Sequence, residues 1–323
     1  MDEVAGSLIV SRRIDVHAHY LPQSYRDAMV AAGHDRPDGF PQIPDWSAEE
    51  HVRAMDRLGI ATSLLSISSP GVFFGDASAA RALAREVNDI GRRAVVDHPG
   101  RFGLFAALPL PDVDAAVAEI ERCSEHLDVN GFALLTNYGG TYVGDPSFEP
   151  VFRELNRRRA RVFLHPTSPA CWQQTSLGRP RPMLEFFFDT TRAVADLVLS
   201  GTIARHGEIE MIVPHAGATL PMIVDRIAIF ARLLAVDPSV DVLRDVARLH
   251  YDLAGFPVPR QLDALLTMTA REHLHYGSDY PFTPEVAVAM AAQALEGAGD
   301  GSLIATLRGN TERLFPELCA LAR

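Results

Sequence analysis

Short apolar runs alternate with amphipathic stretches along almost the whole chain. Most of the apolar runs are continuous, as expected of parallel strands buried on both faces. They predict eight strands, at Arg13–His19, Ala61–Ser68, Phe102–Leu108, Gly131–Leu135, Arg161–His165, Glu210–Pro214, His250–Ala254 and Leu274–Gly277. The stretches between them have helical periodicity and predict helices at Ala48–Leu58, Ala77–His98, Asp112–His126, Phe148–Arg159, Phe186–Arg205, Leu220–Ala235, Arg260–Met268 and Pro284–Gln293.

Eight strands that alternate with helices predict an α/β fold, a (β/α)8 TIM barrel in a single domain over residues 1–323. A doubly wound α/β sheet is the alternative that periodicity alone leaves open. Two connections are longer than a usual strand-to-helix loop: Leu21–Trp46 after the first strand and Thr167–Glu185 after the fifth. Long loops at the carboxyl ends of barrel strands are where such folds keep their specificity.

The composition is that of a globular protein with an acidic balance. The 323 residues carry a formal net charge of −11, with 47% hydrophobic and 22% charged residues. A negative field argues against a nucleic-acid partner. No apolar run approaches the roughly 18 residues of a membrane span, and Met1–Ser11 lacks a signal-peptide pattern. Cys123, Cys171 and Cys319 offer neither a disulfide framework nor a zinc-thiolate spacing. We expect a cytoplasmic protein with no membrane partner.

The chain contains no lysine, since all 30 basic residues are arginines. This excludes mechanisms that need an amine, namely Schiff bases, covalent pyridoxal phosphate and P-loop phosphate binding. It also excludes a metal pair bridged by a carbamylated lysine.

Two histidines close the first predicted strand in the sequence Asp15-Val16-His17-Ala18-His19. The period-2 geometry of a strand places His17 and His19 on one face, toward the mouth of the barrel. Two neutral imidazoles so placed can hold a first-row metal ion, with Asp15 one layer below as an orienting residue. For this motif by itself, two unrelated polar residues at a strand end are an equally good interpretation.

Three further polar residues stand at the carboxyl ends of other predicted strands. His165 closes the fifth strand, His215 follows the sixth and Asp279 follows the eighth. This is the face on which barrel active sites are built. A buried structural histidine would explain either histidine alone, but the coincidence at strands 1, 5, 6 and 8 indicates a site.

Four motifs in this order resemble those of the amidohydrolase superfamily: His17-Ala18-His19, His165-Pro166, His215-Ala216-Gly217 and Gly277–Phe282. The chain is most similar to the metal-dependent decarboxylase branch, which includes aminocarboxymuconate-semialdehyde, γ-resorcylate and 6-methylsalicylate decarboxylases. The similarity covers nearly the whole chain, and 6-methylsalicylate decarboxylases look closest. The resemblance implies that one divalent metal is held by His17, His19, His165 and Asp279. It also implies that His215 is an active-site histidine beside the substrate and not a ligand.

The fourth predicted strand, with the sequence GFALLTN, has no lysine to bridge two metals. We therefore expect a mononuclear site of three imidazoles and one carboxylate. Zn²⁺ suits this donor set best, with Mn²⁺ as the alternative because metal availability also selects.

Arg226 lies eleven residues after His215, on the helix that follows the sixth strand. The resemblance implies that an arginine at this spacing reaches the active site of a neighbouring subunit and pairs there with the substrate carboxylate. This predicts a homodimer; an ion pair with Asp225 is the alternative. The muconate-type enzymes carry a second arginine in the first loop, and Gly39–Trp46 has no basic residue there. This departure favours a monocarboxylate over a dicarboxylate.

Aromatic residues stand at several positions that follow predicted strands. These are Trp46, Phe73, Phe74, Trp172 and Phe282. An apolar slot with a metal at its base would suit a small flat aromatic acid, and we expect Phe73, Trp172 and Phe282 to bind it. The run Phe186–Phe188 is expected to pack within its helix.

The preferred hypothesis is a metal-dependent carbon–carbon lyase that decarboxylates an ortho-hydroxylated aromatic acid of the 6-methylsalicylate type, without an organic cofactor. Asp279 would protonate the ring carbon that bears the carboxylate, and His215 would stabilise the phenolate or assist the proton transfer. A mononuclear metal-dependent hydrolase of a lactone or amide, with Asp279 as general base, is the alternative. A metal-binding barrel without catalysis is a third hypothesis.

Overall fold

Eight parallel strands form the centre of the computed structural model, which describes residues 13–235, 237–298 and 301–320. They are hydrogen-bonded in the order β1-β2-β3-β4-β7-β8-β9-β10. Their bounds are β1 (Arg13–His19), β2 (Ile60–Ser66), β3 (Phe102–Ala107), β4 (Gly131–Leu135), β7 (Arg161–His165), β8 (Glu210–Val213), β9 (His250–Asp252) and β10 (Leu274–His275). All eight predicted strands are present, and most differ from the prediction only by one or two residues at an end.

The sheet closes on itself where the segment around β10 meets β1. The Val16 amide donates to the Tyr276 carbonyl at 2.9 Å, and the His19 amide donates to the Tyr280 carbonyl at 2.8 Å. An open doubly wound sheet has no such contact between its first and last strands. The predicted (β/α)8 barrel is therefore confirmed.

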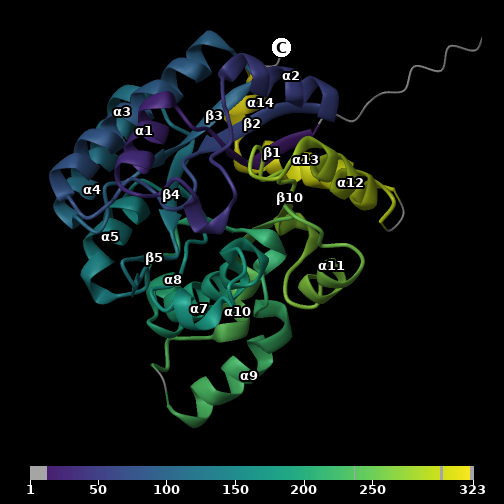
Figure 1. Ribbon diagram of the computed structural model, residues 1–323. Coiled ribbons are helices and arrows are strands. Elements are labelled where there is room, and N and C mark those ends of the chain that lie inside the picture. Colours follow the sequence, from purple (N-terminus) through teal and green to yellow (C-terminus); the bar gives the residue numbers. More distant parts are fainter. Residues whose placement is uncertain (1–12, 236, 299–300, 321–323) are drawn as a thin grey trace, which may run out of the picture.

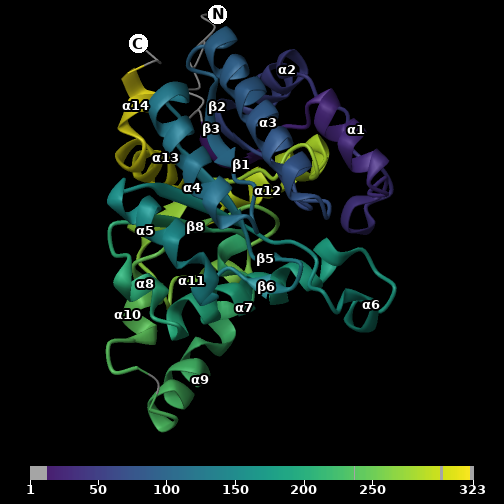
Figure 2. The same ribbon diagram turned by 90° about the vertical axis from the view of Figure 1, so that its left-hand side faces the viewer.

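Helices surround the strands on the outside in both views of the ribbon (Figure 1, Figure 2). Those that correspond to predicted helices are α2 (Ala48–Leu58), α3 (Ala77–Asp97), α4 (Val113–Arg122), α5 (Glu149–Arg157), α7 (Glu185–Leu199), α9 (Leu220–Leu233), α11 (Arg260–Leu265) and α12 (Glu285–Glu296). The predicted helix Phe186–Arg205 is divided at Gly201 (φ 73°), after which α8 (Thr202–Arg205) begins. The predicted helix Asp112–His126 continues beyond α4 as a π-helical segment, Cys123–Leu127.

Several short elements lie outside the predicted set. They are α1 (Gln23–Ala31), α6 (Trp172–Thr175), α10 (Val242–Ala247), α13 (Leu303–Leu314), α14 (Pro316–Ala320) and the hairpin β5 (Asn137–Tyr138)–β6 (Thr141–Tyr142). The long predicted loops contain α1 and α6, and Figure 2 shows both helices on the same side of the molecule. Short helices inside loops lack the extended apolar periodicity that makes a helix visible in a sequence.

Two apolar layers stabilise the barrel. The inner cluster takes residues from six strands and fills the barrel interior, where Phe105 stacks on Phe163 with ring centroids 5.4 Å apart. Phe315, which follows α13, meets Phe105 edge to face. A larger cluster lies between the strands and the surrounding helices. This double burial explains why the strands are continuously apolar.

No helix within the described ranges is both long and apolar enough to cross a bilayer. The chain start, where the sequence shows no signal-peptide pattern, and residues 321–323 lie outside the described residues. A single domain over the full range 1–323 therefore stays a prediction. Cys123 and Cys171 are free thiols, and the side chain of Cys319 lies outside the described part.

Candidate metal centre and active-site cavity

Four side chains converge at the carboxyl ends of the strands. They are His17 and His19 of β1, His165 of β7 and Asp279 after β10, and one potential ligand atom from each lies within 4.8 Å of all the others. Asp279 Oδ1 is 3.4 Å from His17 Nε2 and 3.1 Å from His19 Nε2. The structure thus brings together the four residues that the resemblance implies as metal ligands.

The Nδ1 atom of each imidazole, on the side away from the centre, has a hydrogen-bond acceptor. The Nδ1 atom of His17 donates to Asp252 Oδ2 at 2.9 Å, and that of His165 to the Pro166 carbonyl at 2.7 Å. The Nδ1 atom of His19 lies 3.0 Å from Ser66 Oγ, which itself donates to a backbone carbonyl. These bonds leave each Nε2 lone pair directed at the centre.

A divalent metal ion fits this donor set. His17 Nε2 is buried and has no hydrogen-bond partner among the described residues. Three imidazole nitrogens and one carboxylate oxygen at this spacing are the ligands that a mononuclear tetrahedral site uses. The four residues therefore form a metal-binding group.

The electrostatics of the group also favour a cation. Burial lowers the pKa of His17, but the charges of Asp252 and Asp279 outweigh it and raise this pKa to about 10. Burial raises the pKa of Asp279, but the neighbouring histidines outweigh it and hold this pKa well below its usual range. Burial lowers the pKa of His165 well below its usual value. Two ionised carboxylates beside buried imidazoles create a site that binds positive charge.

The carboxylate that orients a metal-site imidazole is Asp252, at the end of β9, which the sequence analysis missed. The sequence analysis expected Asp15 to orient a metal-site imidazole. Asp15 instead accepts hydrogen bonds from the backbone amides of His17 and Ser278, both at 3.0 Å. A register shift in β1 between Asp15 and Ala18 explains the difference. The shift lets Val16 join the inner apolar cluster while His17 still faces the centre. Like His165, Asp252 is a polar residue at the carboxyl end of a barrel strand.

His215 lies beside the metal group and outside it. It begins a short turn in which His215 and Ala218 have φ values of 54° and 58°. Gln261 Nε2 holds this turn by donating to the carbonyls of His215 at 2.5 Å and Ala218 at 3.0 Å. The His215 ring stacks on Phe187 at 5.6 Å, and its Nε2 is 3.9 Å from Asp279 Oδ2. Strained backbone that is held in place in this way is typical of functional turns.

A cavity of about 550 Å³ opens above these groups. His165, His215 and Asp279 line it, and five phenylalanines contribute to its walls. The aromatic lining residues are Phe40, Phe186, Phe187, Phe256 and Phe282. Phe282 is therefore where the sequence analysis placed it. Phe186 and Phe187 were assigned to helix packing, and this was wrong, because α7 turns both rings toward the cavity.

The other aromatic residues named from the sequence lie elsewhere. Phe73 and Trp172 line a second cavity of about 480 Å³, which shares Asp38 with the first. Trp46 donates to His51 Nδ1 and packs against the core, as does Phe74. Their positions depend on how the loops that carry them fold, which the sequence pattern does not show.

The profile of the family described as amidohydrolase matches residues 14–316, which is nearly the whole chain. The chain belongs to the amidohydrolase family. It is 34% identical over 320 residues to the 6-methylsalicylic acid decarboxylase acuB of Aspergillus aculeatus, covering 95% of this chain and 96% of that protein. It is 35% identical over 291 residues to the 6-methylsalicylic acid decarboxylase of Penicillium expansum, covering 88% and 89% of the two chains. A crystal structure of an amidohydrolase II superposes with a TM-score of 0.89 at 35% identity, over 94% of this chain and 99% of that one.

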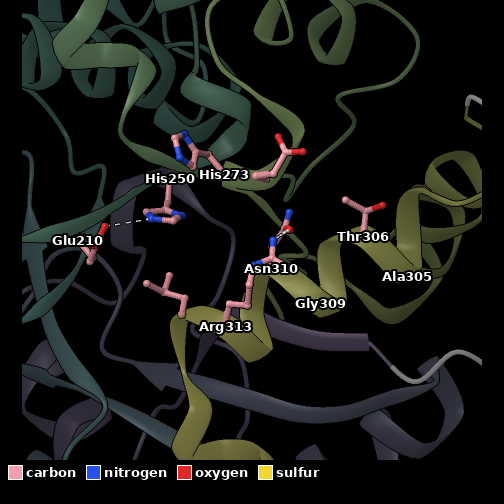
Figure 3. Close-up of a pocket in the computed structure, with 10 residues that line it drawn as sticks. Glu210, His250, His273, Ala305, Thr306, Gly309, Asn310 and Arg313 are labelled. Carbon is pink, nitrogen blue, oxygen red and sulfur yellow. Dashed lines mark hydrogen bonds and ion pairs between the residues drawn. The ribbon is translucent and has the colours of Figure 1, made fainter.

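The opposite end of this amidohydrolase barrel also has a cavity, of about 640 Å³ (Figure 3). His250 lies between Glu210, at 3.1 Å from its Nε2, and His275, at 2.8 Å from its Nδ1. Asn310 ties the same region together by donating to the carbonyls of Arg271 and Leu274. These groups stand at the amino ends of strands, where polar networks of barrels serve stability.

Arg226 lies on α9, a helix that projects away from the barrel in both ribbon views (Figure 1, Figure 2). Its side chain is exposed, with Cζ 4.8 Å from the centroid of the Phe230 ring. Within the described residues no ion pair joins it to Asp225 or to any other carboxylate. It does not line the cavity of its own chain.

Proposed function

We propose that this amidohydrolase is a metal-dependent, non-oxidative decarboxylase of a small ortho-hydroxylated aromatic acid of the 6-methylsalicylate type. The observation that carries the proposal is a metal-binding group of three histidines and one aspartate at the base of an aromatic cavity. The relatives named as 6-methylsalicylic acid decarboxylases, at 34% and 35% identity over most of both chains, support the same reaction class.

The cavity walls suit a flat ring. Phe187 and Phe282 offer apolar contacts on the two sides of the base, since Phe187 stacks on His215 and Phe282 meets His19 at 5.7 Å. A ring held between them has its carboxylate and ortho oxygen directed at the metal group. The bound divalent ion supplies positive charge that polarises these two oxygens.

The two carboxylate oxygens of Asp279 face different groups. Its Oδ1 is directed at His17 and His19, whereas its Oδ2 is 3.9 Å from His215 Nε2 and 3.2 Å from Thr283 Oγ1. We infer that the negative charge of the entering substrate raises the pKa of Asp279, so that Oδ2 takes up a proton and delivers it to the ring carbon bearing the carboxylate. The carbon–carbon bond then breaks, its electron pair stays on the ring and restores aromaticity, and carbon dioxide leaves. His215 stabilises the phenolate and assists the proton transfer.

We further propose that the metal is a single Zn²⁺ ion. Three imidazoles and one carboxylate are the ligands that zinc prefers, and a chain without lysine has no carbamylated residue to bridge a second ion. Elemental analysis should give about one zinc per chain. One manganese per chain would change the identity of the ion only, and two tightly held ions would contradict the mononuclear site.

The substrate carboxylate needs a positive partner, and we propose that it comes from a second copy of this chain. No arginine lines the metal cavity among the described residues. α9 presents a row of exposed apolar side chains beside Arg226, including Ile229, Phe230 and Leu233. An apolar helix face with an arginine in it fits a homodimer interface that inserts Arg226 into the partner's cavity. A cytoplasmic location remains part of the proposal and is testable by cell fractionation.

The reaction class is tested by incubating the purified protein with salicylate-type acids and, separately, with a panel of lactones and amides. We expect carbon dioxide release from 6-methylsalicylate and loss of that activity in His17→Ala, which removes a metal ligand. Hydrolysis of a lactone without carbon dioxide release would favour the hydrolase alternative. Absence of both activities in the metal-loaded protein would indicate a binding protein.

A further inference from the structure

The second cavity lies next to the metal cavity and holds a positive charge that no carboxylate of the described residues contacts. It is enclosed by the two long loops, by the connection between β2 and α3 that carries Phe73, and by the hairpin β5–β6. Phe73, Trp172, Arg36, Asp38 and Arg181 are among the residues that line it. Asp38 is the one residue of these that also borders the metal cavity.

Arg181 is held rigidly by its surroundings. Its guanidinium carbon lies 4.2 Å from the centroid of the Trp172 ring, so the aromatic face supports the cation. Its Nε donates to Ser168 Oγ at 3.1 Å, and that hydroxyl donates to Asp38 Oδ1. Gly39, with φ 80°, comes so close that a Cβ there would be 2.7 Å from Arg181 Nη1. The position of the guanidinium is thus fixed from three sides.

The charge of Arg181 is nevertheless unneutralised by contact. The residue is only partly exposed, and burial lowers the pKa of its guanidinium more than the nearby charge of Asp38 raises it. Within the described residues no carboxylate lies within 4.0 Å of it, and its two Nη atoms have no hydrogen-bond acceptor. A partly desolvated cation with free N–H groups that line a cavity is an arrangement that an anion stabilises.

The residues that line the second cavity indicate which kind of anion it binds. Trp172 and Phe73 contribute flat apolar surface, and the cavity volume of about 480 Å³ accommodates a ring. Arg36 adds a second positive charge, against the single carboxylate of Asp38, whose oxygen is already bonded to Ser168. A carboxylate on a planar group matches both the guanidinium fork and the aromatic walls.

We propose that this second cavity is a distinct binding site for a planar aromatic carboxylate, held by Arg181 against Trp172. A chain with its metal cavity occupied therefore binds a further carboxylate molecule at the loops. The site does not depend on decarboxylation, because none of the metal-group residues lines it.

Trp172 makes the site directly observable. The chain has two tryptophans, so Trp46→Phe leaves Trp172 as the only one. We would titrate this metal-loaded variant with 3-nitrobenzoate, which quenches indole fluorescence on contact and lacks the ortho-hydroxyl that the metal cavity requires. Saturable quenching is expected. Arg181→Met in the same background should weaken the apparent affinity at least tenfold, while the matched change Arg179→Met, at an exposed arginine two positions earlier, should leave it unchanged.

Three results would overturn the proposal. Equal affinity for 3-nitrobenzoate in the Arg181→Met variant would show that the guanidinium does not take part in binding. Equal affinity for the neutral isostere 3-nitrobenzamide would show apolar binding without charge recognition. Loss of quenching when a chelator removes the metal would place the carboxylate at the metal centre. Calorimetry on the wild-type protein provides a second measurement if the tryptophan variant folds poorly, with one 3-nitrobenzoate expected per chain both with and without the metal, and no binding contradicting the proposal. Carbon dioxide release, which tests the decarboxylase, is measured independently of all these.

Discussion

Asp252 shows how one buried carboxylate serves two parts of an active site. Its Oδ2 accepts from His17 Nδ1, and its Oδ1 accepts from the backbone amides of His215 and Ala254. Burial alone raises the pKa of Asp252, but the charge of His17 and its hydrogen bond lower it below the usual value. The same side chain therefore orients a metal-binding imidazole and fixes the turn that carries His215.

Asp252→Asn should weaken metal binding by about 10–100-fold, the usual cost of losing the partner that orients a metal-binding histidine. The asparagine keeps the size of the side chain but removes its negative charge. Competition with a chromophoric chelator measures the affinity. Glu210→Gln, which changes a carboxylate at the opposite end of the barrel, is the matched control and should leave the affinity unchanged. Unaltered metal binding in Asp252→Asn would mean that His17 does not depend on this bond.

His215→Ala separates proton transfer from metal binding. The imidazole stands 3.9 Å from Asp279 Oδ2 and is not one of the four converging residues. We expect the variant to retain its metal and to lose turnover by ~10²–10⁴-fold, the range typical of a positioned acid–base group. Metal content and carbon dioxide release are measured on the same sample. Loss of the metal together with the activity would make His215 a ligand.

At the scale of elements, the strands and most of their polar ends could be predicted, but of the aromatic cavity walls only Phe282 could. A continuous apolar run identifies a buried parallel strand, and the rule that barrel sites lie at carboxyl ends then selects His165 and Asp279. Asp252 was missed because it lies inside the predicted strand His250–Ala254, whereas β9 ends at Asp252 itself. Phe187 could not be assigned, because the direction of its ring depends on how α7 is rotated against the barrel. The positions of Phe73 and Trp172 depend on loop folding in the same way.

Two adjacent phenylalanines of α7 provide a matched test of this wall. Phe187 stacks on His215 and lines the metal cavity, whereas Phe188 is 39% exposed and does not line it. Phe187→Ala should raise KM for the aromatic acid and lower kcat, because it removes both an apolar wall and the support of the His215 ring. Phe188→Ala should leave both constants near the wild-type values. Equal effects of the two changes, with equal losses in thermal stability, would reduce Phe187 to a packing residue.

At the scale of the whole molecule, the two ends of the barrel carry different groups. The carboxyl end holds the metal group and both loop-enclosed cavities, whereas the amino end holds the hydrogen-bonded cluster around His250. α9 belongs to neither end, since it projects outward with Met222, Leu233 and Leu234 each more than 70% exposed. So much apolar surface on one projecting helix is unfavourable in water, and association of two copies would remove it.

Mixing two inactive variants tests whether that association completes the active site. Arg226→Ala lacks the proposed carboxylate partner, and His215→Ala lacks the proton-transfer group. If Arg226 acts across the interface, a heterodimer has one site with both defects and one site with neither. Activity should then return under conditions where subunits exchange, approaching one working site per heterodimer.

The control for this experiment replaces the neighbouring exposed residue. Asp225→Ala should be active alone, and it should dimerise as the wild-type protein does, since its carboxylate has no part in the proposed clamp. If Arg226 instead acts within its own chain, every site in the mixture keeps one defect and no activity returns. Weaker dimerisation of Arg226→Ala alone would identify an arginine that only packs the interface, because a lost interface contact shifts the monomer–dimer equilibrium with protein concentration. Restored activity with an unchanged dimerisation constant therefore requires a guanidinium that crosses from one subunit into the other's cavity.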